Sequence, residues 1–504
     1  MLYWKRMLVP LVLVALFLSG CAGTAAPSDS GATDTAADTA ADADAELSGS
    51  LSFYPQNYYN PEALPDAAAV VEAVRDEYTT ENPGVSIELV PYVGDANTYR
   101  SWLLTRLSAG QAPNITWEQY SDRNAEGAEV WVDLTDYFEQ PNPYVAEGEP
   151  GSKRWADLFP DYVLAQTRGG DGRWYEVSLD WIETGLFYNK EVFTQAGIEP
   201  DWTNMEDLMA DCQALRDAGV EPVGVFITPE WSTYQWLDDI FFSSAFSDVG
   251  PEWYMEKYNI PGRDFRRLNP EEFAKAVHDG HVSVDNERFD VYLDLVKQFT
   301  DACIMDGFAG GVALADVERM FVEGQVSMAW LTTGSATGLA ESVKFDYGLT
   351  YFPPISNAMN PHEIHTDSSY RVGGPSGNAQ YGITQVTAQQ GLLDEALDFL
   401  MFWTAPQNFS RVYDSYPALV PMVAGVEPSE IAAEFQFVAG MPERLVGDPI
   451  ARLTPQFGTE HNRLFQQFML GEIDAETLKT QYQPLLEQGA TDACTQNEWD
   501  WCGE

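Results

Sequence analysis

Positively charged residues are scarce in this chain of 504 residues. Lysine and arginine together number 27 against 78 aspartates and glutamates, so the formal net charge at pH 7 is −51. So acidic a surface repels the phosphate groups of nucleic acids and of anionic lipids. The composition therefore argues against a nucleic-acid partner and against an anionic solute as the main ligand.

Long apolar runs are also few, and the one near the N-terminus is informative. Residues 7–18 follow two basic residues and are too few to span a bilayer, which is typical of a signal peptide, here assigned to residues 1–20. The sequence Leu18-Ser19-Gly20-Cys21 has the form of a lipobox and predicts that Cys21 is acylated. An ordinary signal peptide followed by an incidental cysteine is the alternative. No other run approaches the length of a membrane span, so a lipid would be the only membrane attachment.

Aromatic residues are absent from the segment that follows. Residues 21–49 consist almost entirely of Ala, Thr, Asp, Ser and Gly, which cannot bury enough apolar area to fold. A flexible coil of this length spans roughly 30 Å. We expect a disordered linker that holds the folded part close to the outer face of the cytoplasmic membrane.

Cysteine is rare, with five residues in all. Four remain besides Cys21, and an even number in an exported chain favours disulfides. Cys494 and Cys502 are close together in the polar tail, residues 491–504, and predict a local bond. Cys212 and Cys303 lie in expected helices; either a bridge or two buried thiols fits, and the even count favours the bridge.

Catalytic and nucleotide-binding motifs are missing. The chain has no G-x-S-x-G elbow, no phosphate-binding glycine loop and no H-E-x-x-H pair, so we expect neither a cofactor nor a bound metal. Carboxylates are too numerous for the sequence to exclude a catalytic pair, because that role depends on their separation in space.

What is present is an alternation of short strands and helices. From Leu51 onward the pattern predicts a helix at 67–81, a strand at 85–91, a helix at 99–109 and a strand at 113–117. Such alternation is typical of α/β layers with a mainly parallel sheet.

The most informative stretch is residues 172–200. It predicts a strand at 174–179, a second short strand at 186–188, and a helix that begins after Asn189 and ends at Gly197. Polar and aromatic side chains are left at the junction between the two strands, namely Asp180, Trp181, Glu183 and Thr184.

This stretch resembles the family 1 extracellular solute-binding proteins of ABC transporters, in Tyr188-Asn189-Lys190 and in the helix from Phe193 to Gly197. Proline, usual in that family before the junction, is replaced by Ser178 or Leu179. Further segments match the family's motifs in the family's order, namely 82–85, 108–115, 132–135, 321–328, 373–374 and 394–407.

The resemblance implies two α/β lobes of the type II, maltose-binding-protein-like fold, closing around a ligand. We expect an N-terminal lobe of residues 50–180 plus 326–371 and a C-terminal lobe of residues 181–325 plus 372–490. The implied function is that of a monomer which captures a carbohydrate, with an oligosaccharide favoured, and delivers it to permease subunits without chemical turnover.

Candidate ligand-binding residues combine aromatic rings with hydrogen-bonding groups near expected strand ends. A sugar presents apolar C–H faces and hydroxyls, and ligands of open α/β sheets collect where strands end. Glycines there let backbone amides approach a hydroxyl closely. The candidates are Tyr58, Trp117, Glu118, Asp180, Trp181, Glu183, Trp231, Trp236, Trp330, Gly373 and Gly374. For each aromatic residue the alternative is ordinary core packing.

Two other functions fit the same composition. A secreted glycoside hydrolase would need two carboxylates about 5 to 10 Å apart across a cleft. A binder of a cationic solute such as a polyamine fits the acidic charge, and its binding would weaken sharply with salt.

Overall fold

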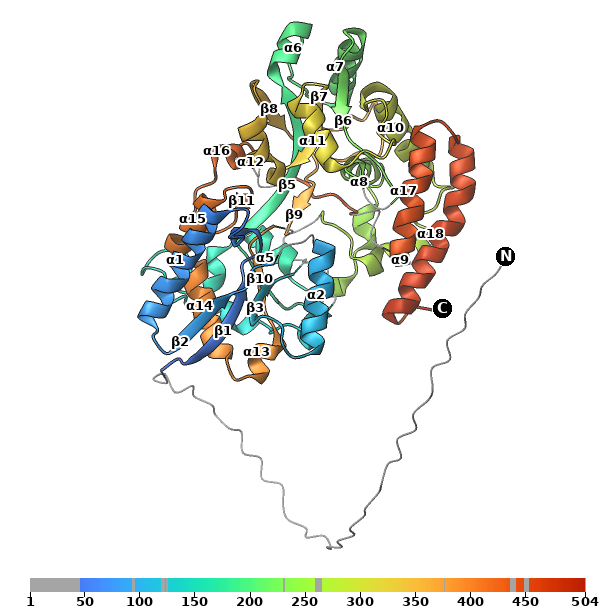
Figure 1. Cartoon of the computed structure of the whole chain (residues 1–504). Coiled ribbons are helices and arrows are strands. Elements are labelled where there is room, and N and C mark those ends of the chain that lie inside the picture. Colours follow the sequence, from blue (N-terminus) through green and yellow to red (C-terminus); the bar gives the residue numbers. More distant parts are fainter. Residues whose placement is uncertain are drawn as a thin grey trace, which may run out of the picture. The chain divides into compact units, whose positions relative to one another are not determined.

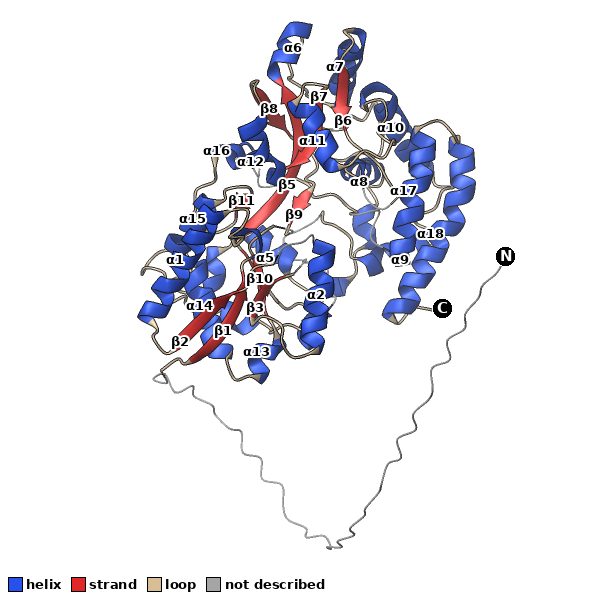
Figure 2. Ribbon diagram, viewed as in Figure 1, coloured by secondary structure: helices blue, strands red, loops and turns tan. Residues whose placement is uncertain are grey.

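The computed structural model describes residues 46–503 except 93–95, 119–122, 124–125, 170, 230–231, 259–264, 376, 436–440 and 448–452. The signal peptide, Cys21, the linker up to residue 45 and Trp231 lie outside the described residues. Figure 1 traces the chain by residue number, and Figure 2 separates helices from strands.

The first sheet has the strand order β2-β1-β3-β10-β4. Strand β1 runs parallel to β2 and β3, whereas β10 is antiparallel to β3 and β4. Along β2 buried and exposed residues alternate, as expected of a strand at a sheet edge, while the central β3 is buried throughout. The strands are β1 (Gly49–Tyr54), β2 (Val85–Leu89), β3 (Ile115–Trp117), β4 (Val177–Ser178) and β10 (Gln380–Ile383).

Helices from two distant parts of the chain cover this sheet. The ring of Phe53 in β1 meets Phe399 and Trp403 edge to face, with centroids 5.5 and 4.9 Å apart. The core of the first lobe is therefore completed by a segment about 350 residues away in sequence. The helices are α1 (Pro65–Glu81), α2 (Ala96–Ser108), α4 (Thr135–Phe138), α5 (Asp161–Thr167), α13 (Gln385–Gln389), α14 (Leu393–Thr404) and α15 (Pro406–Ser415), with a 3₁₀ turn at Gln56–Tyr58.

The second sheet is organised around one long strand, β5. Strands β7, β8, β9 and β11 all pair antiparallel with it, and β6 runs parallel to β7. The strands are β5 (Asp180–Asn189), β6 (Glu221–Gly224), β7 (Val326–Thr332), β8 (Tyr347–Thr350), β9 (Gly373–Gly374) and β11 (Val420–Pro421).

The helices of the second lobe begin and end at recognisable residues. Asn189 caps α6 by accepting hydrogen bonds from the amides of Glu191 and Val192, and Gly197, at φ 72°, ends it in the left-handed conformation. The helices are α6 (Lys190–Ala196), α7 (Met205–Asp217), α8 (Tyr234–Ala245), α9 (Pro270–His278), α10 (Glu287–Cys303), α11 (Leu314–Val322), α12 (Thr333–Ser342), α16 (Glu430–Glu434), α17 (Pro455–Met469) and α18 (Ala475–Asn497).

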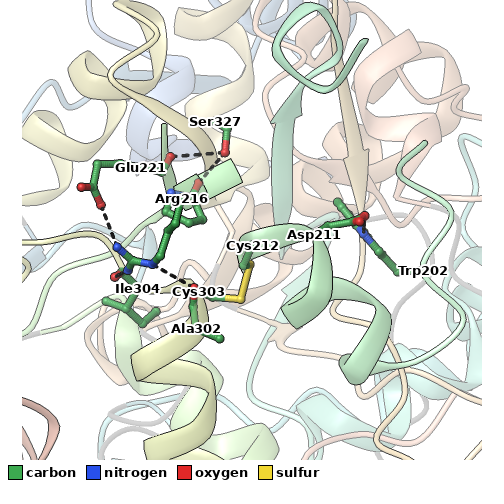
Figure 3. Close-up of a disulfide and its surroundings, with 10 residues drawn as sticks. Trp202, Asp211, Cys212, Arg216, Glu221, Ala302, Cys303, Ile304 and Ser327 are labelled. Carbon is green, nitrogen blue, oxygen red and sulfur yellow. Dashed lines mark hydrogen bonds and ion pairs between the residues drawn. A yellow bond between two sulfur atoms is a disulfide. The ribbon is translucent and has the colours of Figure 1, made fainter. Parts of the chain in front are cut away.

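Two disulfides lie in the second lobe. Cys212 of α7 bonds to Cys303 of α10, with the Cα atoms 5.0 Å apart (Figure 3). Beside this bond, Arg216 Nε donates to the carbonyl of Ala302 at 3.0 Å, so the two helices are also joined by a hydrogen bond. Cys494, near the end of α18, bonds to Cys502.

Three segments connect the two sheets. They are Ser178–Asp180 between β4 and β5, Gly374–Gln380 between β9 and β10, and residues 416–429 between α15 and α16, which include β11.

The lobe boundaries expected from the sequence differ from this arrangement. Residues 326–371 are expected in the N-terminal lobe, but β7 and β8 pair with β5 in the second sheet. Residues 372–490 are expected in the C-terminal lobe, but β10 inserts between β3 and β4, and α13 to α15 pack on the first core. Strand pairing across hundreds of residues decides the lobe, and local sequence patterns do not report it.

Candidate functional site

The junction between the lobes is built on the first residues of β5. Asp180 is fully buried; its Oδ2 accepts from the Tyr58 hydroxyl at 2.9 Å and its Oδ1 from the Ala379 amide at 2.9 Å. Burial raises the pKa of the Asp180 carboxyl to about 7, against the opposing effect of these donors. Tyr58 and Asp180 are therefore brought together, as part of the packed junction.

Trp181 is the next residue and is also fully buried. Its ring lies 5.4 Å from that of Tyr162 and 5.2 Å from the Arg371 guanidinium. Within the described part of the chain its Nε1 has no hydrogen-bond partner. A Cβ added to Gly374 would stand 3.3 Å from that nitrogen, so the glycine lets β9 pack close to the indole.

A largely buried set of ion pairs adjoins Trp181. Glu183 pairs with Arg371, and burial raises the pKa of the Glu183 carboxyl while the guanidinium opposes that rise. Gln166 of α5 donates to Glu443, so the two lobes touch here. The acidic members are Glu183, Glu443 and Asp239, and the basic members are Arg371, Arg444 and Arg267.

Among the described residues, this set joins three carboxylates to three guanidiniums. A buried charge without a partner is costly, so each member is held in place by its neighbours. An arrangement of this kind provides hydrogen-bonding groups of fixed position for a polar ligand.

Trp117 and Glu118 lie where β3 ends in the first lobe. Trp117 is 4 % exposed, and its Nε1 donates to the Gly377 carbonyl at 2.9 Å. The buried Glu118 carboxylate lies 3.5 Å from Arg100 of α2, which also contacts Glu126 at 3.1 Å.

The same edge carries a half-buried aromatic pair that is not among the residues expected from the sequence. Tyr92, just beyond β2, and Trp102 of α2 have ring centroids 5.4 Å apart, and Arg106 lies 4.5 Å above the Trp102 ring. Tyr92 also meets Tyr99, which in turn contacts Trp117. The rule applied to Trp117, an aromatic residue after an expected strand, would have found Tyr92, because that residue follows the strand expected at 85–91.

The other candidates are dispersed. Trp330 lies within β7, is 1 % exposed and packs on Phe352 at 5.9 Å, so core packing accounts for it. Trp236 is half-buried in α8. A Cβ at Gly373 would come 2.5 Å from both Glu183 Oε2 and the Ile182 carbonyl, which ties that glycine to strand packing. Trp117, Trp181 and Trp330 are all so buried that a ligand could stack on them only after neighbouring groups had moved.

Comparison with known proteins places the chain in a family. The sequence profile described as bacterial extracellular solute-binding protein matches residues 73–437. The chain belongs to this family. Its members are binding proteins and not enzymes, so the expectation of a family of solute-binding proteins without turnover is confirmed.

Solved structures of low sequence identity share the fold of this solute-binding protein. RafE from Streptococcus pneumoniae is 16 % identical, with a TM-score of 0.61 over 89 % of this chain and 99 % of that one. UgpB from Mycobacterium tuberculosis, solved with glycerophosphocholine, is 16 % identical, with a TM-score of 0.59 over 88 % of this chain and 98 % of that one. These neighbours confirm the expected two-lobed α/β fold of the maltose-binding-protein type.

The chain is also similar in sequence to YcjN of Escherichia coli (strain K12), which is named as an ABC transporter periplasmic-binding protein. It is 27 % identical over 159 residues, which are 31 % of this chain and 34 % of YcjN. The match thus spans about a third of that relative. Among the described residues, no helix of this solute-binding protein combines the length and apolar character needed to cross a membrane.

Proposed function

We propose that this solute-binding protein captures a neutral carbohydrate between its two lobes and delivers it to the permease subunits of an ABC importer. In this proposal it works as a monomer at the outer face of the cytoplasmic membrane, anchored through a lipid on Cys21 and the linker at 21–49. The name of YcjN supports the transporter class. The short apolar run at 7–18, followed by Cys21, supports the anchor.

The observation that carries the carbohydrate assignment is the aromatic edge of the first lobe. Tyr92 and Trp102 form a half-buried pair where the parallel strands end, and the Arg100–Glu118 ion pair lies beside the same helix and strand. Aromatic faces suit the C–H surface of a sugar ring, and charged groups fixed by partners suit its hydroxyls.

Two fold neighbours are named for sugar ligands: RafE, in complex with raffinose, and a chitin oligosaccharide binding protein. UgpB, which was solved with glycerophosphocholine, has the same fold. The fold alone therefore does not determine which solute is bound. A net charge of −51 makes a phosphate-bearing solute less favourable here.

The test is a titration of the protein, by calorimetry and by tryptophan fluorescence, against raffinose, chitin oligosaccharides, glycerophosphocholine and spermidine. We expect saturation by a neutral sugar, with little dependence on salt. Saturation by spermidine alone, lost at high salt, would favour a cation binder instead. Shortened sugars after prolonged incubation would favour a glycoside hydrolase.

The aromatic edge gives a variant test. Replacing Trp102 with alanine should weaken sugar binding by about 1 to 3 kcal/mol, as the loss of an aromatic anchor commonly does. Trp499→Ala is the matched control, because Trp499 stacks on Trp501 in the C-terminal tail and should not affect binding. Equal affinities in the Trp102 variant and the wild type would place the sugar elsewhere.

A further inference from the structure

The three segments that connect the sheets meet at Asp180. The first segment contains this residue. The second contributes the Ala379 amide, which donates to Oδ1 at 2.9 Å. The third contributes Pro421, which pairs with Asp180 between β11 and β5. Tyr58, in the 3₁₀ turn after β1, adds its hydroxyl at 2.9 Å from Oδ2.

In the described part of the chain, hydrogen bonds and not an ion pair hold this carboxyl group. Among the described residues its donors are one phenol and the backbone amides of Ala379 and Asn378. The titratable groups that face it are Tyr58, Tyr381 of β10 and Tyr413 of α15, all neutral near pH 7 because burial raises their pKa values. A carboxylate fully removed from water without a cation is costly.

The packed junction consequently prefers the protonated acid. Burial raises the pKa of Asp180 from 3.8 to about 7, although the donors favour the charged form. Protonation of Asp180 therefore favours formation of the packed junction, and formation of the packed junction favours protonation. Thermodynamic coupling between two equilibria is reciprocal in this way. Protonation at low pH favours the packed arrangement. Ionisation, as pH rises through about 7, favours arrangements in which water reaches the carboxylate.

We propose that Asp180 is a pH-sensitive hinge residue: its neutral form holds the three connecting segments in the packed junction, and its ionised form releases them to other lobe arrangements. This role is independent of the identity of the solute. It can therefore be tested on the protein without ligand, so that failure of the hinge proposal and failure of the carbohydrate proposal remain distinguishable.

The test measures distances between the lobes. Leu104 of α2 and Leu470, which follows α17, are 40 % and 47 % exposed and can carry spin labels as Leu104→Cys and Leu470→Cys. The full chain also carries Cys21→Ser so that this thiol does not react. Double electron–electron resonance should give one narrow distance distribution at pH about 5.5. At pH about 8.5 a second population should appear, with a midpoint near 7.

Two variants identify the titrating group. Asp180→Asn keeps the shape without the charge and should give the same distribution at both pH values. Tyr58→Phe removes a donor that favours the ionised form, so the midpoint should move to higher pH. Tyr59→Phe is the control: Tyr59 donates to Glu72 instead, and the midpoint should stay at its wild-type value.

The proposal is overturned if the wild type gives one distribution at both pH values, or if Asp180→Asn retains the wild-type transition. Should Asp180→Asn fail to fold, the Tyr58→Phe midpoint decides, and an unchanged or lowered midpoint would count against the hinge role. A merely structural contribution of Asp180 would lower stability without a pH-dependent change in distance.

Discussion

Single residues at the junction are fixed by close packing against β5. Gly373 and Gly374 pair with Glu183 and Ile182, and the space beside each glycine is taken by protein atoms. Glycines beside a strand junction suit close contact with a ligand hydroxyl, which is the role expected from the sequence. The structure gives them a packing role that needs no ligand.

A substitution at Gly373 tests this packing. In Gly373→Ala the new Cβ would come 2.5 Å from the Ile182 carbonyl, which is backbone and cannot rotate away. We expect the free energy of unfolding to fall by about 1 to 3 kcal/mol. Gly338→Ala, in α12 with open space at its Cβ, should be neutral or raise stability by up to about 1 kcal/mol. Denaturant unfolding compares the two, and equal stabilities would contradict the packing role.

The candidate site was only partly predictable at this scale. Asp180, Trp181 and Glu183 could be singled out because polar and aromatic residues at a strand junction are unusual. Arg371 and Glu443, which complete the site, lie 188 and 260 positions beyond Glu183 and carry no local signal. Burial of Trp330 could not be foreseen either, since an aromatic residue at a strand end and one inside a strand look alike in sequence.

At the scale of elements, helices were more predictable than strand partners. Asn189 and Gly197 bound α6 where the sequence predicted, because capping depends on neighbouring residues. Strand β4, expected at 174–179, is only Val177–Ser178, and β5 is far longer than the expected 186–188. Pairing with four partners lengthens β5, and those partners are remote in the chain.

The disulfide between α7 and α10 gives a prediction for these elements. Cys212 and Cys303 are 91 residues apart, whereas Cys494 and Cys502 are eight apart. Constraint of the unfolded chain grows with loop length, so replacing the first pair with alanine should cost about 4 to 5 kcal/mol and replacing the second about 2 to 3 kcal/mol. Denaturant midpoints of the two double variants provide the measurement. A greater loss from the C-terminal pair would contradict this ranking.

For the whole molecule, charge is the dominant property. A net charge of −51 disfavours the compact state through self-repulsion, which dissolved ions screen. The thermal midpoint should therefore rise with sodium chloride between about 0.05 and 1 M. Sucrose at matched osmolality is the control, because it stabilises by exclusion from the surface and screens no charge. If the thermal midpoint does not change with sodium chloride, or rises equally in sucrose, then charge repulsion does not lower the stability of the folded state.

The length of β5 has a mechanical consequence. Its ten residues begin at the junction and end at the start of α6, and a strand of that length spans about 33 Å. If β5 moves as a rigid body, a tilt of about 10° at Asp180 displaces the far end of the strand by roughly 6 Å. A small rotation of β5 around the Asp180 carboxyl group would thus displace the surface at the far end of the strand far enough to change its contacts with a second protein.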